Sequence, residues 1–120
     1  MILADTCIWI DFFRNQNELF ALLLNRSQIN SHWIVIGELA SGNLPARQQT
    51  LADLRNLPRV QPASSRESLA LIENHALYGH GLSWNDLQLL ASALIHRTPI
   101  WTHDKRLKRI AMELNVCYLP

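Results

Sequence analysis

Short apolar runs alternate along the chain with longer segments in which apolar residues recur every three or four positions. The short runs, bounded by polar residues or prolines, are typical of strands, and the longer segments are typical of helices with one buried face. The predicted strands are residues 1–5, 28–31, 59–61, 99–102 and 116–119. The predicted helices are residues 6–14, 17–26, 32–41, 45–56, 64–78, 83–96 and 105–114.

Strands separated by helices favour βαβ units, and therefore a mostly parallel sheet that is covered by helices on both faces. The sequence thus predicts an α/β fold of three layers, α/β/α, around a short sheet of five strands. With 120 residues, 48% of them apolar, the chain can form one hydrophobic core but not a second. We expect a single domain over residues 1–120.

The overall charge gives no reason to expect general attraction to a polyanion or to a membrane. The 11 Lys and Arg residues balance 10 Asp and Glu residues, for a formal net charge of +1. No apolar run approaches the roughly 20 residues that a membrane span needs. Two cysteines without a recognisable apolar leader favour a reducing compartment, so we expect a soluble, cytoplasmic protein.

Four of the acidic residues stand at unusual places in the pattern. Asp5 directly follows the first predicted strand and also suits the N-cap of the next helix. Asp86 matches a capping box that begins at Ser83, and Asp104 suits a helix N-cap or a counter-charge for its basic neighbours. Glu38 falls on the apolar face of its predicted helix, where a glutamate needs a partner or a ligand. Taken singly, these residues are explained by caps and structural pairs.

Taken together, the four acids favour a shared site. The carboxyl ends of parallel strands meet at one edge of a sheet, where ligands bind, and Asp5 and Asp104 both follow predicted strands. Two carboxylates about 4 Å apart repel by roughly 4 kcal/mol at an effective dielectric constant near 20, so such a cluster needs a cation or shared protons. Oxygen ligands favour Mg²⁺ or Mn²⁺ over zinc. The five histidines lack metal-ligand spacing, and we interpret them as surface or packing residues.

The last predicted helix carries basic residues on one face and apolar residues on the other. Its basic side chains, together with one from the preceding turn, are candidates for binding RNA phosphates. A solvated helix face without any ligand explains the same pattern. The candidate residues are Arg97, Lys105, Arg106, Lys108 and Arg109.

Four short motifs follow one another along the chain. They are Asp5-Thr6 after the first predicted strand, Glu38-Leu39-x-x-Gly42, Asp86 at the start of an apolar helix, and Thr102-x-Asp104 before Lys-Arg-Leu. In this order and at this spacing the motifs resemble those of the PIN-domain ribonucleases, and more narrowly those of the VapC toxins of bacterial toxin–antitoxin pairs. The resemblance covers essentially the whole chain. One departure is Cys7, where the pattern usually has Ser or Asn.

The resemblance implies a PIN-like fold in which the strands before Asp5 and Asp104 are neighbours. It also implies an Mg²⁺-dependent endoribonuclease toxin that hydrolyses RNA phosphodiester bonds, forms a homodimer and is neutralised by a cognate antitoxin. The implied catalytic and metal-binding residues are Asp5, Glu38, Asp86 and Asp104. The implied supporting residues, which hydrogen-bond to this site, are Thr6 and Thr102.

Two other classes of function remain open at this stage. A catalytically inactive PIN-like domain that binds RNA or protein fits the same fold, although the complete set of acids argues against a loss of activity. A phosphoryl-transfer enzyme or receiver domain with Asp5 as phosphate acceptor is less favoured. The phosphatases that use an aspartate nucleophile carry a second aspartate two residues later, and Cys7 occupies that position here.

Overall fold

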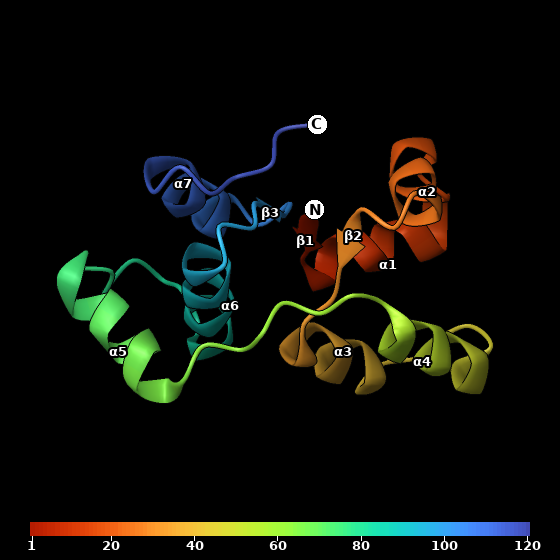
Figure 1. The fold of residues 1–120 in the computed structure, drawn as a ribbon, viewed down its shortest axis with the longest axis horizontal. Helices are drawn as coiled ribbons and strands as arrows, with labels where there is room; N and C mark the ends of the chain where they lie inside the picture. The colour runs from red at the N-terminus through yellow and green to blue at the C-terminus, as the bar shows by residue number, and fades with distance from the viewer.

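A computed structural model describes all residues, 1–120, and shows a parallel sheet with helices around it (Figure 1). Because the strands are very short, helices make up most of the molecule. None of the helices is long and apolar enough to cross a membrane. In chain order the elements are β1 (Ile2–Ala4), α1 (Thr6–Asn15), α2 (Glu18–Asn25), β2 (Ile29–Asn30), α3 (Trp33–Ala40), α4 (Arg47–Asn56), α5 (Ser65–Asn74), α6 (Trp84–Ile95), β3 (Ile100–Trp101) and α7 (Lys105–Glu113).

The sheet has the strand order β2-β1-β3, and both pairings are parallel. Leu3 in β1 is paired with Asn30 on one side and with Ile100 on the other. The central strand is therefore the one that leads to Asp5, and its neighbour β3 leads to Asp104. This adjacency agrees with the expectation from the sequence.

The predicted sheet of five strands is reduced to three strands with a single bridge at each outer edge. Ser31 forms a parallel bridge with Arg59, and Ile100 forms one with Cys117. The segment around Arg59 cannot lengthen this pairing, because prolines at 58 and 62 lack the N–H group that a strand ladder needs. Both bridges fall within predicted strands, residues 59–61 and 116–119.

Apolar residues of the sheet and of the helices around it form one cluster of 23 buried side chains. Leu3 and Ala4 of the central strand are fully buried, as are Ile29 and Ile100 on the neighbouring strands. Continuous burial of successive residues is expected for strands that are covered on both faces. The core therefore fixes the strand ends from which the polar residues emerge.

Helices α1, α3 and α7 each begin within four residues of the end of a strand. Their N-termini consequently gather at the carboxyl edge of the sheet, where exposed backbone N–H groups and the helix dipoles favour negative charge. The predicted boundaries of these helices are correct to within a residue. A larger difference occurs at α5, which ends at Asn74 although the pattern predicted a helix to residue 78.

Candidate active site

Four carboxylates line one open pocket of about 430 Å³ at the carboxyl edge of the sheet. Asp5 stands between β1 and α1, Glu38 belongs to α3, Asp86 to α6, and Asp104 precedes α7. We call this cavity the acidic pocket. Its other lining residues are Thr6, Cys7, Ile10 and His103. The fold thus gathers residues that are up to 99 positions apart in the sequence, from Asp5 to Asp104.

Three of these acids also cap helices, as their local sequences predicted. Asp5 Oδ1 accepts a hydrogen bond from the backbone N–H of Thr6 at 2.8 Å. Asp104 Oδ1 accepts from the N–H groups of Arg106 and Leu107 at 3.0 and 2.9 Å. Asp86 and Ser83 form the predicted capping box in both directions, at 3.1 and 3.2 Å. Capping and clustering are compatible, because Asp86 and Asp104 each use one carboxylate oxygen for the cap and keep the other free.

The two predicted supporting threonines hydrogen-bond within this pocket. Thr102, which is 4% exposed, donates from Oγ1 to Asp5 Oδ2 at 2.7 Å and accepts from the backbone N–H of Asp104 at 3.1 Å. Thr6 donates from Oγ1 to Glu38 Oε1 at 2.9 Å. Thr102 therefore connects β1 to the start of α7, and Thr6 connects α1 to α3.

The structure adds two polar pocket residues that the sequence interpretation did not assign to the site. Cys7 Sγ lies 3.7 Å from Asp5 Oδ2 and 3.6 Å from Thr102 Oγ1, and it accepts a hydrogen bond from the His103 backbone N–H at 3.3 Å. Burial raises the pKa of this thiol, which keeps it protonated. The imidazole of His103 is exposed, with Nε2 3.9 Å from Asp11 Oδ2. The sequence could have indicated Cys7 and His103 only through their positions near Asp5 and Asp104 in the chain.

The environment of the acidic pocket disfavours accumulated negative charge. Burial raises the pKa of Asp5, and the Asp86 carboxylate raises it further, against hydrogen bonds from Thr102 and Thr6 that lower it. The pKa of Glu38 is raised by burial and by the charges of Asp5 and Asp86, while the hydrogen bond from Thr6 opposes that shift. A bound cation would relieve this repulsion directly.

Similarity to known proteins agrees with this geometry. Residues 2–113 match the PIN-domain family, which is nearly the whole chain. The protein belongs to the PIN-domain family. Two relatives from Mycobacterium tuberculosis, strains CDC 1551 / Oshkosh and ATCC 25618 / H37Rv, are both described as Ribonuclease VapC32. Each is 38% identical to this chain over 117 residues, which cover 97% of this chain and 94% of the relative.

A solved structure described as a toxin-antitoxin complex from Klebsiella pneumoniae has the same fold. Its chain superposes with a TM-score of 0.66 over 87% of each chain, at 24% identity. The predicted PIN-like α/β fold is confirmed, with three regular strands instead of five. The likeness to VapC toxins, inferred from four short motifs, is confirmed by the 38% identical relatives.

The acidic pocket of this PIN domain fits a hard divalent cation in donor type and in charge. Its donors are carboxylate oxygens, which Mg²⁺ and Mn²⁺ prefer, and Asp86 and Asp104 each keep an oxygen without a hydrogen bond. In the structure, however, no three His, Cys, Asp or Glu side chains are close enough to hold a metal ion together. Coordination by three of the carboxylates therefore requires side-chain rotation towards the centre of the pocket.

The basic candidates of this PIN domain separate into two locations. Lys105, Arg106 and Arg109 are exposed on α7, directly after Asp104, while Lys108 is half-buried. Arg97 instead precedes β3 and lines a cavity with residues that follow α7. It lies at the amino edge of the sheet, opposite the acidic pocket. Arg97 therefore stands apart from Asp104, near the residues that follow α7, and its contact with RNA stays a prediction.

Arg106 is held in place by an unusual close contact. Its guanidinium packs against Gly81, where an added Cβ would stand 2.7 Å from Nη1. Gly81 also has a φ of +80°, a backbone conformation that side-chain-bearing residues rarely adopt. The positive φ favours glycine here, and the absence of a side chain allows Arg106 to rest on the loop that leads to Ser83 and α6.

Proposed function

We propose that this PIN domain is a metal-dependent endoribonuclease that hydrolyses RNA phosphodiester bonds at the acidic pocket. The observation that carries the proposal is the convergence of four carboxylates on one open cavity, two of them with a raised pKa. Structural ion pairs do not explain this arrangement, because no Lys or Arg side chain forms a salt bridge with any of the four acids. The name of the relatives, Ribonuclease VapC32, supports the same chemistry.

The residues that hold the metal in this proposal are Asp5, Asp86 and Asp104, with Glu38 completing the negative pocket. Bound Mg²⁺ or Mn²⁺ supplies a Lewis acid for the phosphate and a water of lowered pKa. Thr102 orients Asp5 and favours its ionised form, because a hydrogen bond to a carboxylate stabilises the charge. Thr6 does the same for Glu38.

A negative pocket must still bind a polyanion, and the start of α7 supplies the opposite charge. Lys105, Arg106 and Arg109 are exposed and follow Asp104 directly. We infer that they contact phosphates that flank the cleaved bond, which positions the RNA without reading its sequence. Asp104 already accepts hydrogen bonds from the backbone N–H groups of Arg106 and Leu107, so we assign the phosphate contacts to the basic side chains.

We also propose that the protein is a VapC-like toxin that forms a homodimer and is neutralised by a cognate antitoxin in the cytoplasm. The 38% identity to Ribonuclease VapC32 supports this context. Co-expression with a candidate antitoxin, followed by size-exclusion chromatography with light scattering, would measure both assemblies. A monomer at micromolar concentration that co-purifies with no partner and cuts RNA freely during co-expression would contradict the proposal.

The direct test is cleavage of single-stranded RNA by the purified protein with Mg²⁺, with Mn²⁺ and with EDTA. Cleavage is expected only with a divalent ion, and the melting temperature of the protein should rise with Mn²⁺, because an ion that binds only the folded state stabilises it. Glu73→Gln is a suitable control, since Glu73 is exposed on α5 away from the pocket. Cleavage that persists in EDTA would contradict the metal-dependent mechanism.

A catalytically inactive PIN-like module that binds RNA or protein is the second candidate. The observation that favours it is the absence of three side chains already positioned around a metal. This alternative predicts RNA binding with no cleavage under any metal condition and no Mn²⁺-dependent rise in melting temperature. The same two measurements therefore separate the candidates.

A further inference from the structure

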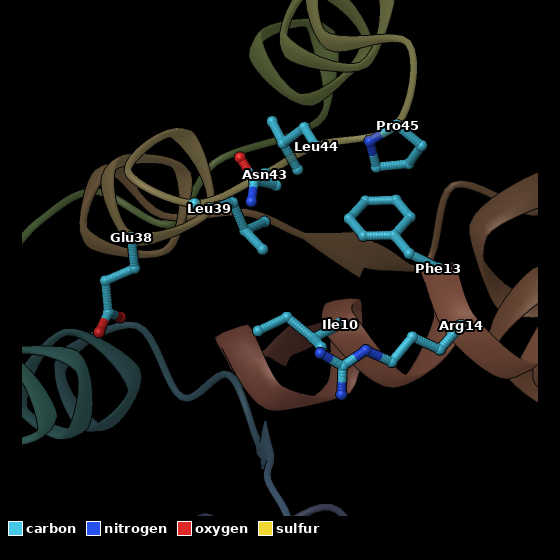
Figure 2. A pocket seen from close by; sticks show the side chains of 9 residues that line it. Ile10, Phe13, Arg14, Glu38, Leu39, Asn43, Leu44 and Pro45 are labelled. Atoms are coloured by element: carbon cyan, nitrogen blue, oxygen red, sulfur yellow. The ribbon is translucent and has the colours of Figure 1, made fainter.

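A second and larger cavity lies beside the acidic pocket. Its volume is about 540 Å³, and it opens between α1 and the segment that joins α3 to α4. Figure 2 shows Phe13 and Arg14 projecting from α1 on one side, and Asn43 and Pro45 on the other. We call this cavity the flanking pocket. Its size falls within the roughly 300–1,000 Å³ of cavities that hold small ligands.

The two cavities adjoin each other, and Ile10 and Glu38 line both of them. Glu38 stands at the boundary: in Figure 2 its carboxylate points away from Phe13 and Pro45, towards α6. Asp86 belongs to α6 and lines the acidic pocket. A chain that is cut at the acidic pocket therefore has its neighbouring unit at the entrance to the flanking pocket.

The flanking pocket contains an unneutralised cation. Arg14 is exposed, and its guanidinium forms neither a salt bridge nor a hydrogen bond within the chain. The one ion pair of the molecule joins His103 to Asp11. Because arginine stays charged at any physiological pH and matches phosphate geometry, Arg14 is suited to an anionic ligand. It also lies on the side of the acidic pocket away from α7.

The remaining walls offer a flat apolar face and one unpaired amide. The rings of Phe13 and Pro45 lie close together in Figure 2, and aromatic faces stack on any nucleobase. The side chain of Asn43 makes no hydrogen bond within the chain, so both its donor and its acceptor are free. This wall is held by Arg47, whose guanidinium donates to the carbonyls of Ala40 and Gly42 at 2.6 and 3.0 Å.

We propose that the flanking pocket binds the nucleoside next to the scissile phosphate of single-stranded RNA. The base stacks on Phe13 and hydrogen-bonds to Asn43, and the adjoining phosphate contacts Arg14. The inference rests on the proposed function, since it takes the position of the cut from the acidic pocket. RNA is favoured over a protein segment because a stacking face, an unpaired amide and an unpaired cation occur together beside the site of phosphodiester cleavage.

Two variants and one matched control test this pocket. Arg14→Gln and Asn43→Ala remove the free polar groups, and Arg26→Gln removes an exposed charge from the end of α2, at the other edge of the sheet. Melting temperatures of all three should stay near that of the wild type. RNA binding is measured by fluorescence anisotropy in an Asp86→Asn background, with a labelled single-stranded RNA of randomised sequence that this background leaves uncut.

Arg14→Gln is expected to weaken RNA binding about fivefold or more and to reduce the slope of log K against log salt by about one. In the active background it should raise KM while leaving kcat nearly unchanged. Asn43→Ala should flatten the base preference at one position beside the cut, read by sequencing the 5′ ends of a cleaved random RNA pool. Arg26→Gln should change none of these quantities.

The inference is overturned if Arg14→Gln and Asn43→Ala bind and cut RNA like the wild type. It is overturned in favour of a protein occupant if the same variants lose affinity for the antitoxin while their RNA affinity and cut profile stay unchanged. Failure of the proposed function looks different. In that case the wild type cuts no RNA under any metal condition, while anisotropy still reports whether Arg14 contributes to RNA binding.

Discussion

Two polar groups of side chains follow the ends of the strands, and they differ in how completely they are satisfied. One consists of His32, after β2, and Ser92, in α6; these residues are 1% and 0% exposed. The other is the acidic pocket after β1 and β3, which opens to solvent. The pair of His32 and Ser92 is neutral and buried, whereas the acidic pocket carries charged groups and is open to solvent.

Both ring nitrogens of His32 and the hydroxyl group of Ser92 have hydrogen-bond partners. Nδ1 accepts a hydrogen bond from the Ile34 N–H at 3.0 Å, so we infer that Nε2 carries the proton and donates to Ser92 Oγ at 2.9 Å. Ser92 in turn accepts from the Ala63 N–H at 2.9 Å and donates to the Gln88 carbonyl at 2.8 Å. This network joins three distant segments and leaves nothing for a ligand to bind.

The acidic pocket has the opposite character. Asp86 and Asp104 keep free oxygens, and the pKa values of Asp5 and Glu38 are raised by burial, with like charge adding to the shift. Titratable groups that cluster in a cavity and have perturbed pKa values are candidates for a functional site. The hydrogen bonds of His32 and Ser92 indicate a structural role, whereas the clustered carboxylates with free oxygens are the better candidates for binding a ligand.

The largest expected effect is on activity at the acidic pocket. Asp86→Asn should reduce RNA cleavage by at least about 100-fold, because even residues that only orient metal ligands change activity by roughly 10–100-fold. The variant keeps an acceptor for the Ser83 N–H, so its melting temperature should stay within a few degrees of wild type. If this variant cleaves RNA at the wild-type rate, Asp86 does not take part in catalysis.

His32→Ala should show the reverse behaviour, a loss of stability with little loss of intrinsic activity. It removes a buried ring and both of its hydrogen bonds, and we expect the free energy of unfolding to fall by about 2–4 kcal/mol. Urea denaturation measures the change. His75→Ala, at an exposed position after α5, is the control. Equal urea midpoints for the two variants would contradict a structural role for His32.

The pH dependence of stability provides a third comparison. Burial lowers the pKa of His32 to about 4 in the folded protein, against about 6.5 in an unfolded chain. Because the unfolded state takes up the proton first, the stabilisation is fully present above about pH 6.5. It is lost as pH falls towards about 4, by up to roughly 3 kcal/mol. The raised pKa values of Asp5 and Glu38 act with the opposite sign, since stability from them increases as pH falls.

The contribution of His32 is therefore measured as a difference between two proteins. Free energies of unfolding of wild type and His32→Gln are compared from pH 7 to pH 4, which cancels the part due to the carboxylates. The wild type should lose more stability over this range than the variant. Parallel curves would show that the imidazole is not held neutral by burial.

The smallest expected effect is at Cys7. In Cys7→Ser a hydroxyl replaces the thiol beside Asp5 and Thr102, and it can make the same contacts. Cleavage should change by less than about threefold, because net contributions of single hydrogen bonds are small when partners are conserved. A loss comparable to that of Asp86→Asn would show that the sulfur itself takes part in the site.

The hydrophobic pattern predicted most elements, and its failures have physical causes. The period of residues 64–78 fits one helix, but Ala76 adopts a left-handed φ of 50°. Leu77 then turns back to donate to the Ile72 carbonyl and becomes buried. The burial of Leu77 depends on packing against the core, and the local hydrophobic period carries no information about that packing. The position of Arg97 was likewise set by the fold, since sequence proximity to α7 does not reveal which edge of the sheet a turn occupies.

By itself, the sequence determined where strands and helices form, because apolar period and capping residues act over a few positions. It also supplied the three capping acids, and local geometry explains their caps. Only the tertiary structure decided that Asp5, Glu38, Asp86 and Asp104 share one cavity, because that depends on β1 pairing with β3 and on α3 and α6 reaching the same edge. The four carboxylates face one cavity because segments that are distant in the chain pack together.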